Sequence, residues 1–273
     1  MRVAAVGHVE WVTFALVDRV PSPGDIVESS GAFDCAAGGA AVAAVQLAKL
    51  AGEATLFTAV GDDEPGRRVA GDLEERGVRL RTVTRAAPQR RAVTLLDPGA
   101  ERTIVTLGER LSPRGDDPLP WDELAGMDAI YFVSGDAEAV RLSRRARVVV
   151  GATRVLGALA EAAVELDAVV GSSKDEGERY EEGAIDPAPR YVVRTAGAAG
   201  GTWSGAEGRT GRWEAAPLPG PPVDAYGCGD SFAAGFTFGL ADGRGIDGAL
   251  ELGARCGAAC MTGRGPYAGQ LRL

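Results

Sequence analysis

The chain has 273 residues, of which 45% are hydrophobic and 25% charged, the usual balance of a globular protein. Its formal net charge of −9 argues against nucleic acid as a partner held by general electrostatic attraction. No apolar run approaches the ~18 residues of a membrane span, so we expect no membrane contact. A single histidine excludes most His-based triads, and the four cysteines show no C-x-x-C spacing for zinc, which favours a cytoplasmic setting.

The N-terminal half predicts a strand-rich region with two β-rich excursions. Short apolar stretches indicate strands over residues 2–7, 54–60, 78–83, 92–96 and 103–107. After the first of these, two β-rich stretches, 9–20 and 26–33, flank a Pro/Gly turn. Helices are expected over 40–50 and 64–76, the second of them capped by acidic residues.

From residue 128 onward, strands and helices alternate. Further strands are predicted over residues 129–133, 148–150, 168–170 and 191–195. The helices between them are expected over 137–145, 155–166 and 175–182. A surface hairpin at 204–212 precedes two last helices over 230–240 and 246–261. This alternation implies a parallel sheet with right-handed crossovers, so we predict a single α/β domain over residues 1–273.

Polar residues directly follow several of the predicted strands, where doubly wound sheets bind their ligands. They are His8, Arg154, Ser172, Lys174, Asp175 and Thr195. Two of these places have a simpler explanation: Ser172 and Asp175 would also cap a helix, and the glycines after Thr195 would also make a tight strand-to-strand turn.

One stretch organises the second half of the chain: Asp224-Ala225-Tyr226-Gly227-Cys228-Gly229-Asp230. It joins a Pro-rich loop to an apolar helix, so backbone N–H groups at the helix start would point at an anion. Asp230 either caps this helix or faces the anion site. A carboxylate beside an anion site is what phosphoryl transfer to a hydroxyl requires.

This stretch resembles the D-T-x-G-A-G-D-x-F signature of the ribokinase/PfkB family of carbohydrate kinases. Ala225 and Cys228 depart from it, and the matching positions are Asp224, Gly227, Gly229, Asp230 and Phe232. Residues 60–66 resemble the family's V-G-x-D-x-x-G, and residues 195–200 its T-x-G-x-x-G. The resemblance extends from Gly7 to about Gly265. It implies a doubly wound, mostly parallel sheet flanked by helices, with a small β-lid made by excursions at about 9–34 and 91–108.

The resemblance also implies an ATP-dependent kinase of a sugar hydroxyl, with Asp230 as base. The N–H groups of Gly227, Cys228 and Gly229 would hold the developing charge. The nucleotide and metal residues carried over are Lys174, Asp175, Thr195, Gly197 and Gly200 for ATP, and Asp175 and Asp224 for Mg²⁺. Ser172 and Asp175 stand where the family has N-x-x-E. Ala225 replaces a Thr that shapes a monovalent-cation site in many members, so whether a monovalent cation also binds is left open.

For the acceptor, the resemblance implies contacts from His8, Glu10, Gly38, Gly39 and Arg154. Many sugar-kinase relatives also place an Asp and an Asn against sugar hydroxyls, at positions that correspond to Val12 and Val42 here. Two polar contacts have therefore become apolar, and we expect plain ribose to be a poor substrate.

Three questions stay open at this level. A nucleoside kinase on the same fold is an alternative to a sugar kinase, and so is a non-catalytic ligand-binding relative. The identity of the acceptor is not fixed by any of these motifs. A homodimer through the lid is a further expectation from the resemblance.

Overall fold

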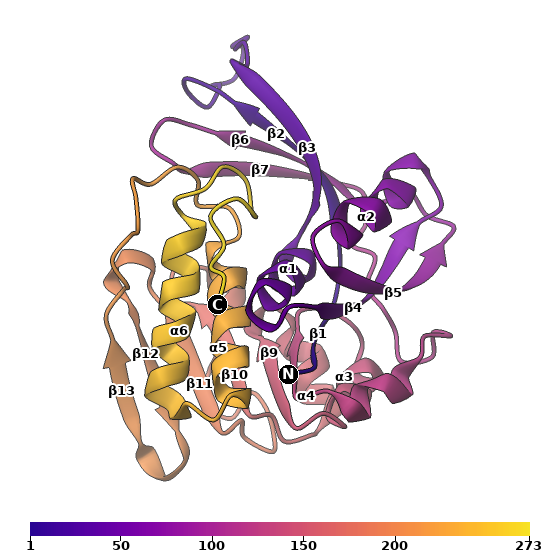
Figure 1. Cartoon of the computed structure of the whole chain (residues 1–273), viewed down its shortest axis with the longest axis vertical. Helices are drawn as coiled ribbons and strands as arrows, with labels where there is room; N and C mark the ends of the chain where they lie inside the picture. The colour runs from indigo at the N-terminus through magenta and orange to yellow at the C-terminus, as the bar shows by residue number, and fades with distance from the viewer.

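The computed structural model describes residues 1–273 and has a nine-stranded sheet at its centre (Figure 1). The strand order is β13-β12-β11-β10-β9-β8-β1-β4-β5. Strand β12 is antiparallel to both of its neighbours, β11 and β13, and all other pairs are parallel. The strands are β1 Val3–Val6, β4 Ala54–Gly61, β5 Val78–Arg85, β8 Ala129–Phe132, β9 Val148–Ala152, β10 Ala168–Ser172, β11 Tyr191–Thr195, β12 Gly201–Gly205 and β13 Thr210–Trp213. The α/β class and the mostly parallel sheet predicted above are confirmed.

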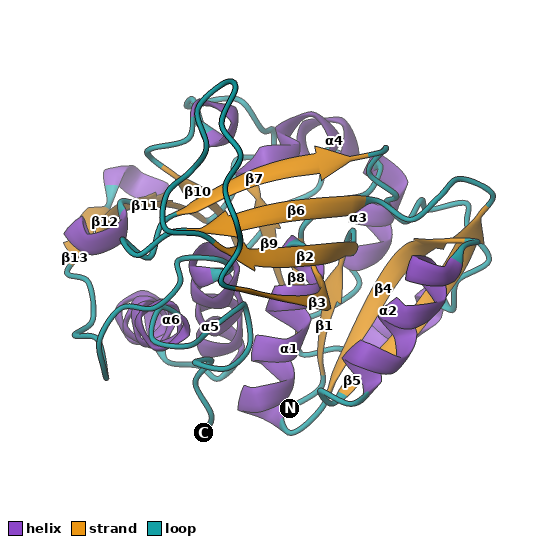
Figure 2. Ribbon diagram, turned by 90° about the horizontal axis from the view of Figure 1, so that it is seen from above, coloured by secondary structure: helices purple, strands orange, loops and turns teal.

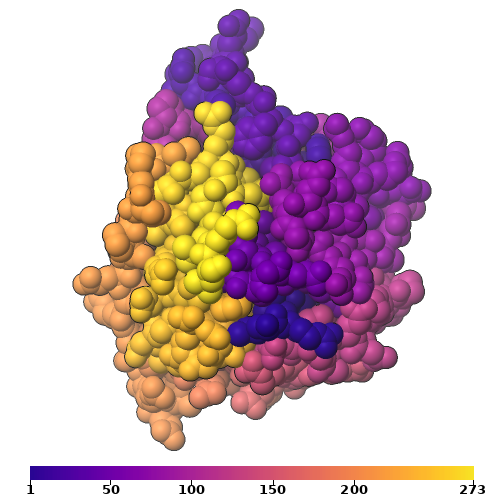
Figure 3. Space-filling model, in the orientation of Figure 1, coloured from indigo at the N-terminus to yellow at the C-terminus, as the bar shows by residue number.

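Helices cover both faces of this sheet. The larger buried core lies under α1 Gly39–Ala51, α2 Glu64–Glu74, α5 Cys228–Ala241 and α6 Gly245–Cys260. A smaller core on the other face lies under the 3-10 helix η1 Trp121–Gly126, α3 Ala137–Ser143 and α4 Leu156–Ala162. Figure 3 shows α6 and the C-terminal segment filling the middle of one face, between the β13 edge and the N-terminal half. None of the helices is long and apolar enough to span a membrane.

The two excursions predicted from the sequence form a separate four-stranded sheet. Its order is β3-β2-β6-β7, and its strands are β2 Glu10–Leu16, β3 Gly31–Ala37, β6 Arg91–Leu96 and β7 Arg102–Leu107. Figures 1 and 2 show this sheet lying across the carboxyl ends of the parallel strands. Whatever binds at those strand ends is therefore covered from one side by the four-stranded sheet.

The strand order places a crevice at the end of β1. The chain passes from β1 to β4 on one side and later returns to β8 on the other side, so the direction of winding changes between β1 and β8. Ligands of doubly wound sheets bind at such a point. The residues after both strands meet there, because the backbone N–H of His8 donates to Ser134 Oγ at 2.9 Å.

Two predicted elements are wrong in extent. The stretch predicted as a strand from residue 26 does not pair until Gly31, where β3 begins opposite Leu16, and Ile26 is 95% exposed. The helix expected over 175–182 is only the 3-10 turn η3 Glu176–Glu178. The backbone becomes extended at Arg179 (φ −67°, ψ 118°), and Arg154, after the neighbouring strand, pairs with Asp175 and Glu178 on this turn.

Candidate active site

Helix α5 presents free backbone donors at its start. Its N-cap is Gly227 in the left-handed region (φ 79°), where a Cβ atom would also lie 2.8 Å from Val42. The backbone N–H groups of Gly227, Gly229 and Asp230 donate to no oxygen in the protein, whereas that of Cys228 makes a long 3.5 Å bond to the Ala225 carbonyl. Three free donors therefore lie together at the start of the helix, with Asp230 in place of Cys228 as the third of them.

Asp230 is the third residue of α5, not the N-cap that the sequence pattern suggested. Its carboxylate lies against α1, where a Cβ added to Gly39 would come within 2.9 Å of Asp230 Oδ1. Burial, followed by the nearby Glu178 carboxylate, raises the pKa of Asp230 to about 6. A carboxylate with this pKa is a stronger base than an ordinary aspartate and is still ionised at neutral pH.

Asp224 organises the loop before the helix. It is fully buried, and its two oxygens accept hydrogen bonds from the backbone N–H groups of Tyr226 and Gly265, both at 2.8 Å. Burial raises the pKa of this carboxyl group, while the two hydrogen bonds oppose that rise. These contacts favour a loop-shaping role for Asp224 over the metal-binding role expected from the resemblance.

Four residues expected at the acceptor site come together at the crevice. Gly38, in the left-handed region (φ 88°), caps α1, and a Cβ there would lie 3.2 Å from Glu10 and 3.4 Å from the His8 ring. Next to it, Gly39 contacts Asp230. Two adjacent glycines thus lie between the predicted base and the side chains of His8 and Glu10.

The charges at this site follow from burial. His8 Nδ1 lies 3.1 Å from Ser134 Oγ, and burial, then Arg110 and Arg90, lowers the pKa of His8 to about 3, so the ring is neutral. Burial raises the pKa of Glu10, although Arg90 opposes the rise from 2.8 Å away. Since His8 is neutral, its 3.9 Å approach to Glu10 is not an ion pair.

Val12 and Val42, which stand where many relatives have sugar-binding polar residues, are both fully buried. Val42 packs against Gly227, and Val12 lies on β2 opposite Cys35. Neither side chain can accept or donate a hydrogen bond. These two positions therefore offer no polar contact to a ligand.

Arg154 does not stand free at the acceptor site, as the sequence analysis assumed. It pairs with Asp175 and, at 2.6 Å, with Glu178, whose other oxygen accepts the Ser172 N–H at 2.7 Å. Glu178 was missed by sequence reasoning, because the run Asp175–Glu178 holds three carboxylates and only the fold turns one of them toward Asp230.

The carboxylates of Asp175 and Glu178 fit Mg²⁺ as oxygen ligands. No group of three or more ligating side chains exists in the structure. Mg²⁺ in phosphoryl-transfer sites is commonly held by one or two carboxylates together with water and substrate phosphates. Asp175 and Glu178 are the carboxylates that could serve in this mode, and in this structure both are paired with Arg154.

The predicted nucleotide residues also meet. Ser173 donates its N–H to the Thr195 carbonyl at 2.8 Å, which ties the end of β10 to the end of β11. A Cβ added to Gly197 would lie 3.4 Å from Lys174 Nζ, and Lys174 forms no ion pair. A cation free of protein partners thus lies over the turn between β11 and β12.

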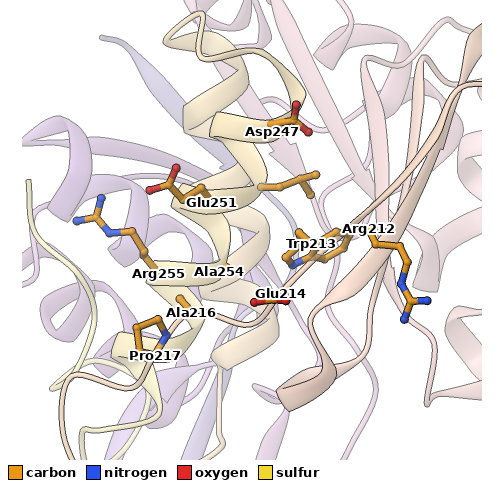
Figure 4. A pocket seen from close by; sticks show the side chains of 10 residues that line it. Arg212, Trp213, Glu214, Ala216, Pro217, Asp247, Glu251, Ala254 and Arg255 are labelled. Atoms are coloured by element: carbon orange, nitrogen blue, oxygen red, sulfur yellow. The ribbon is translucent and has the colours of Figure 1, made fainter.

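A cavity of about 610 Å³ opens beside that turn, between β13 and α6 (Figure 4). Gly200 and Gly201 contact Trp213, which lines the cavity, and Glu251 and Arg255 on α6 form its other wall. Its volume is in the range of small-molecule sites. Sequence reasoning did not find this cavity, because its walls come from segments some 40 residues apart in the chain.

Comparison with known proteins identifies the family of this chain and proteins with a similar fold. The model of the pfkB family carbohydrate kinases matches residues 1–150 and 160–271. The chain is similar to the ATP-dependent ribose-1-phosphate kinase of Halopiger xanaduensis, at 29% identity over 94% of this chain and 91% of that protein. Its fold is similar to that of Thermotoga maritima ribokinase, with a TM-score of 0.78 and 17% identity over 100% of this chain and 96% of the other. It is also similar to that of Sinorhizobium meliloti adenosine kinase, with a TM-score of 0.78 and 21% identity over 97% of this chain and 95% of the other. With the signature loop, its free N–H groups and the ionisable Asp230 in place, the chain belongs to the pfkB family of carbohydrate kinases, and it is an ATP-dependent kinase of a sugar or nucleoside.

Proposed function

We propose that Asp230 removes the proton from an acceptor hydroxyl as that oxygen attacks the γ-phosphorus of ATP. The new O–P bond forms while the bond to the β-phosphate oxygen breaks, and ADP leaves with that oxygen. The observation that carries this proposal is the position of Asp230 beside three free N–H donors at the start of α5. These donors would stabilise the charge on the transferred group without reorganising.

The nucleotide is proposed to lie along the ends of β10 and β11. Lys174 and the turn with Thr195, Gly197 and Gly200 would contact its phosphates, and the cavity beside Trp213 would hold its base. Mg²⁺, when bound by Asp175 and Glu178, would offset phosphate charge. A monovalent cation would bind only if the loop at Ala225 can hold it without the threonine that many family members have at this position.

The acceptor is proposed to occupy the crevice between Gly38-Gly39 and the end of β1, under the four-stranded sheet. The Halopiger relative is named as a kinase of ribose 1-phosphate, so we include a phosphorylated pentose among the acceptor classes proposed for this chain. ATP consumption measured with ribose, ribose 1-phosphate, other free sugars and nucleosides tests the function. Turnover with at least one acceptor, lost in Asp230→Asn, supports it, and no turnover with any acceptor contradicts it.

A nucleoside kinase is the second candidate, because the fold matches the Sinorhizobium adenosine kinase as well as it matches ribokinase. The observation in favour is the apolar character of Val12 and Val42, which offer no hydrogen bond to a sugar hydroxyl at the positions where many relatives do. A non-catalytic relative would instead show thermal stabilisation by its ligand without ATP consumption.

The thiol of Cys228 should be dispensable. Its sulfur lies 3.9 Å from the Asp224 carbonyl oxygen, while contact with Cys260 and burial raise its pKa. We expect Cys228→Ala to keep kcat within about twofold of the parent and to resist any thiol reagent that inhibits the parent. An inactive alanine variant would assign the thiol a role in the reaction.

The four-stranded sheet is proposed to act as a lid. Hydrogen exchange in 9–34 and 91–108 should slow when a proven acceptor saturates the protein, because closing over the ligand protects backbone N–H groups. The hairpin at 204–212, remote from the crevice, is the internal control. Equal exchange in the lid with and without acceptor would contradict closure.

A homodimer through the lid is proposed on the exposure of β7. This edge strand is exposed along its whole length, and Ile104, Val105 and Leu107 are 41%, 54% and 43% exposed. Unpaired apolar edges favour pairing with another chain. We expect light scattering to report a dimer that Val105→Lys dissociates; a monomeric parent at micromolar concentration would overturn the proposal.

The cytoplasm is proposed as the compartment. All four cysteines are free, and three of them are buried. Thiols that stay unpaired in this way are typical of proteins in a reducing compartment.

A further inference from the structure

Tyr226 lies inside the signature loop, four residues before Asp230, and has no role in the reaction described above. Its side chain is buried, with only 6% of the residue exposed. The tyrosine hydroxyl accepts a hydrogen bond from the backbone N–H of Gly38 at 3.2 Å. Gly38 is the glycine that lies against Glu10 and the His8 ring, so the hydroxyl stands at the wall of the proposed acceptor crevice.

The Tyr226 side chain is held in this position by contacts to its ring and to its backbone. Its ring meets Phe14 of β2 edge-on, with ring centroids 4.9 Å apart and an interplanar angle of 78°. Phe14 is fully buried and stacks on Phe33 of β3 at 4.8 Å, which seats the tyrosine against the four-stranded sheet. The Tyr226 N–H donates to Asp224 at 2.8 Å, and its carbonyl accepts from Cys260 Sγ at 3.5 Å. The hydroxyl is therefore preorganised, as a group that binds a ligand needs to be.

The hydroxyl proton of Tyr226 is donated to no atom of the protein. A phenolic hydroxyl can both accept and donate, and here Gly38 uses only its accepting capacity. Burial raises the pKa of Tyr226, and the carboxylates of Glu10 and Asp230 raise it further, so the hydroxyl keeps its proton at neutral pH. These two carboxylates are the groups that approach Gly38 and Gly39. A donor buried to this extent is unfavourable unless a further group receives its hydrogen bond.

We propose that the Tyr226 hydroxyl determines acceptor specificity by donating a hydrogen bond to a second hydroxyl of the acceptor, near the one that Asp230 deprotonates. This inference rests on the proposed function, because it concerns the same crevice. Val12 and Val42 offer no polar contact to a ligand, and Val42 packs against Gly227, the residue that follows Tyr226. The signature loop itself thus supplies a polar contact of the kind that the two valines lack.

The test is Tyr226→Phe, which removes the hydroxyl and keeps the ring against Phe14. Tyr267→Phe is the matched control, because Tyr267 is equally buried and its hydroxyl donates to the Ala36 carbonyl at 2.6 Å, two residues before Gly38. Both variants lose a hydrogen bond to the same backbone segment, but only Tyr226 has a proton left for a ligand. With the acceptor found in the panel assay, we expect Tyr226→Phe to raise the acceptor KM roughly 3–15-fold and to change the KM of ATP less than about twofold. Tyr267→Phe should change neither constant.

Deoxy analogues identify the hydroxyl that receives the bond. Each acceptor that turns over is compared with its analogues, 2-deoxyribose for ribose and 2′- or 3′-deoxyadenosine for adenosine, in the parent and in Tyr226→Phe. One analogue should lose roughly 3–15-fold in kcat/KM with the parent, and this difference should disappear in the variant, because the missing hydroxyl no longer has a donor. Equal discrimination by parent and variant overturns the proposal. Equal effects of Tyr226→Phe and Tyr267→Phe on the acceptor KM also overturn it.

A binding measurement separates this proposal from the kinase function. Adenosine, ribose and ribose 1-phosphate are added without ATP, and the rise in melting temperature is recorded for the parent, Tyr226→Phe and Tyr267→Phe. Stabilisation that is weakened in Tyr226→Phe alone supports the contact even if no acceptor is phosphorylated. Turnover with the same acceptor KM in the parent and in Tyr226→Phe retains the kinase and rejects the contact. Neither stabilisation nor turnover of the parent with any of the three compounds rejects both.

Discussion

Asp230→Asn is expected to lower kcat by roughly 10²–10⁴-fold with little change in the KM of ATP. The substitution keeps the size of the side chain beside Gly39 and leaves the backbone N–H groups of α5 in place. What it removes is the base, because an amide cannot accept the proton of the acceptor hydroxyl. Steady-state kinetics with the acceptor found in the panel assay measure this effect.

The pH profile provides an independent check on Asp230. Because burial and Glu178 raise its pKa to about 6, kcat/KM of the parent should fall as the pH drops below 6, where the base becomes protonated. Glu178→Gln removes a neighbouring negative charge, which should shift this acidic limb to lower pH. Asp242→Asn, at the far end of the same helix, is the control and should change neither rate nor profile. Wild-type turnover in Asp230→Asn would exclude Asp230 as the base.

Asp224→Ala is expected to destabilise the protein by roughly 2–4 kcal/mol. Two buried backbone N–H groups, those of Tyr226 and Gly265, would lose a charged acceptor, and each such hydrogen bond contributes about 1.5–3 kcal/mol. For a chain of this size the melting temperature should fall by roughly 5–12 °C. Activity should fall with it, because Asp224 shapes the loop that carries the free donors.

Magnesium titration distinguishes the two roles considered for Asp224. If the carboxylate shapes the loop, the loss of stability is the same with and without Mg²⁺, and excess Mg²⁺ does not restore activity. If it binds the metal, the melting temperature without Mg²⁺ stays near that of the parent and excess Mg²⁺ restores part of the rate. If Asp224 shapes the loop, Asp224→Asn, which retains one acceptor oxygen, should have a melting temperature between those of the parent and the alanine variant.

The strand-helix alternation and the position of the signature could be predicted from the sequence, because both depend on local patterns. Buried apolar runs such as residues 54–60 form strands in any context that covers both faces. The Gly227–Asp230 stretch forms its free donors from backbone conformation alone, so the motif located them at the start of α5, although it included Cys228 where the structure has Asp230. The parallel sheet and the two β-rich excursions could also be predicted from local sequence patterns.

The tertiary structure alone decided which charges meet. Nothing local indicates that Arg154 pairs with Glu178 or that only a 3-10 turn follows Asp175. The hydrogen bond from the Gly265 N–H to Asp224, 41 residues away, is equally invisible in the local sequence. Charged side chains reach several ångströms and choose partners by what the fold brings near, not by sequence spacing. The sequence therefore predicted the start of α5 as the place of the free donors, while only the fold showed which charged groups surround Asp230.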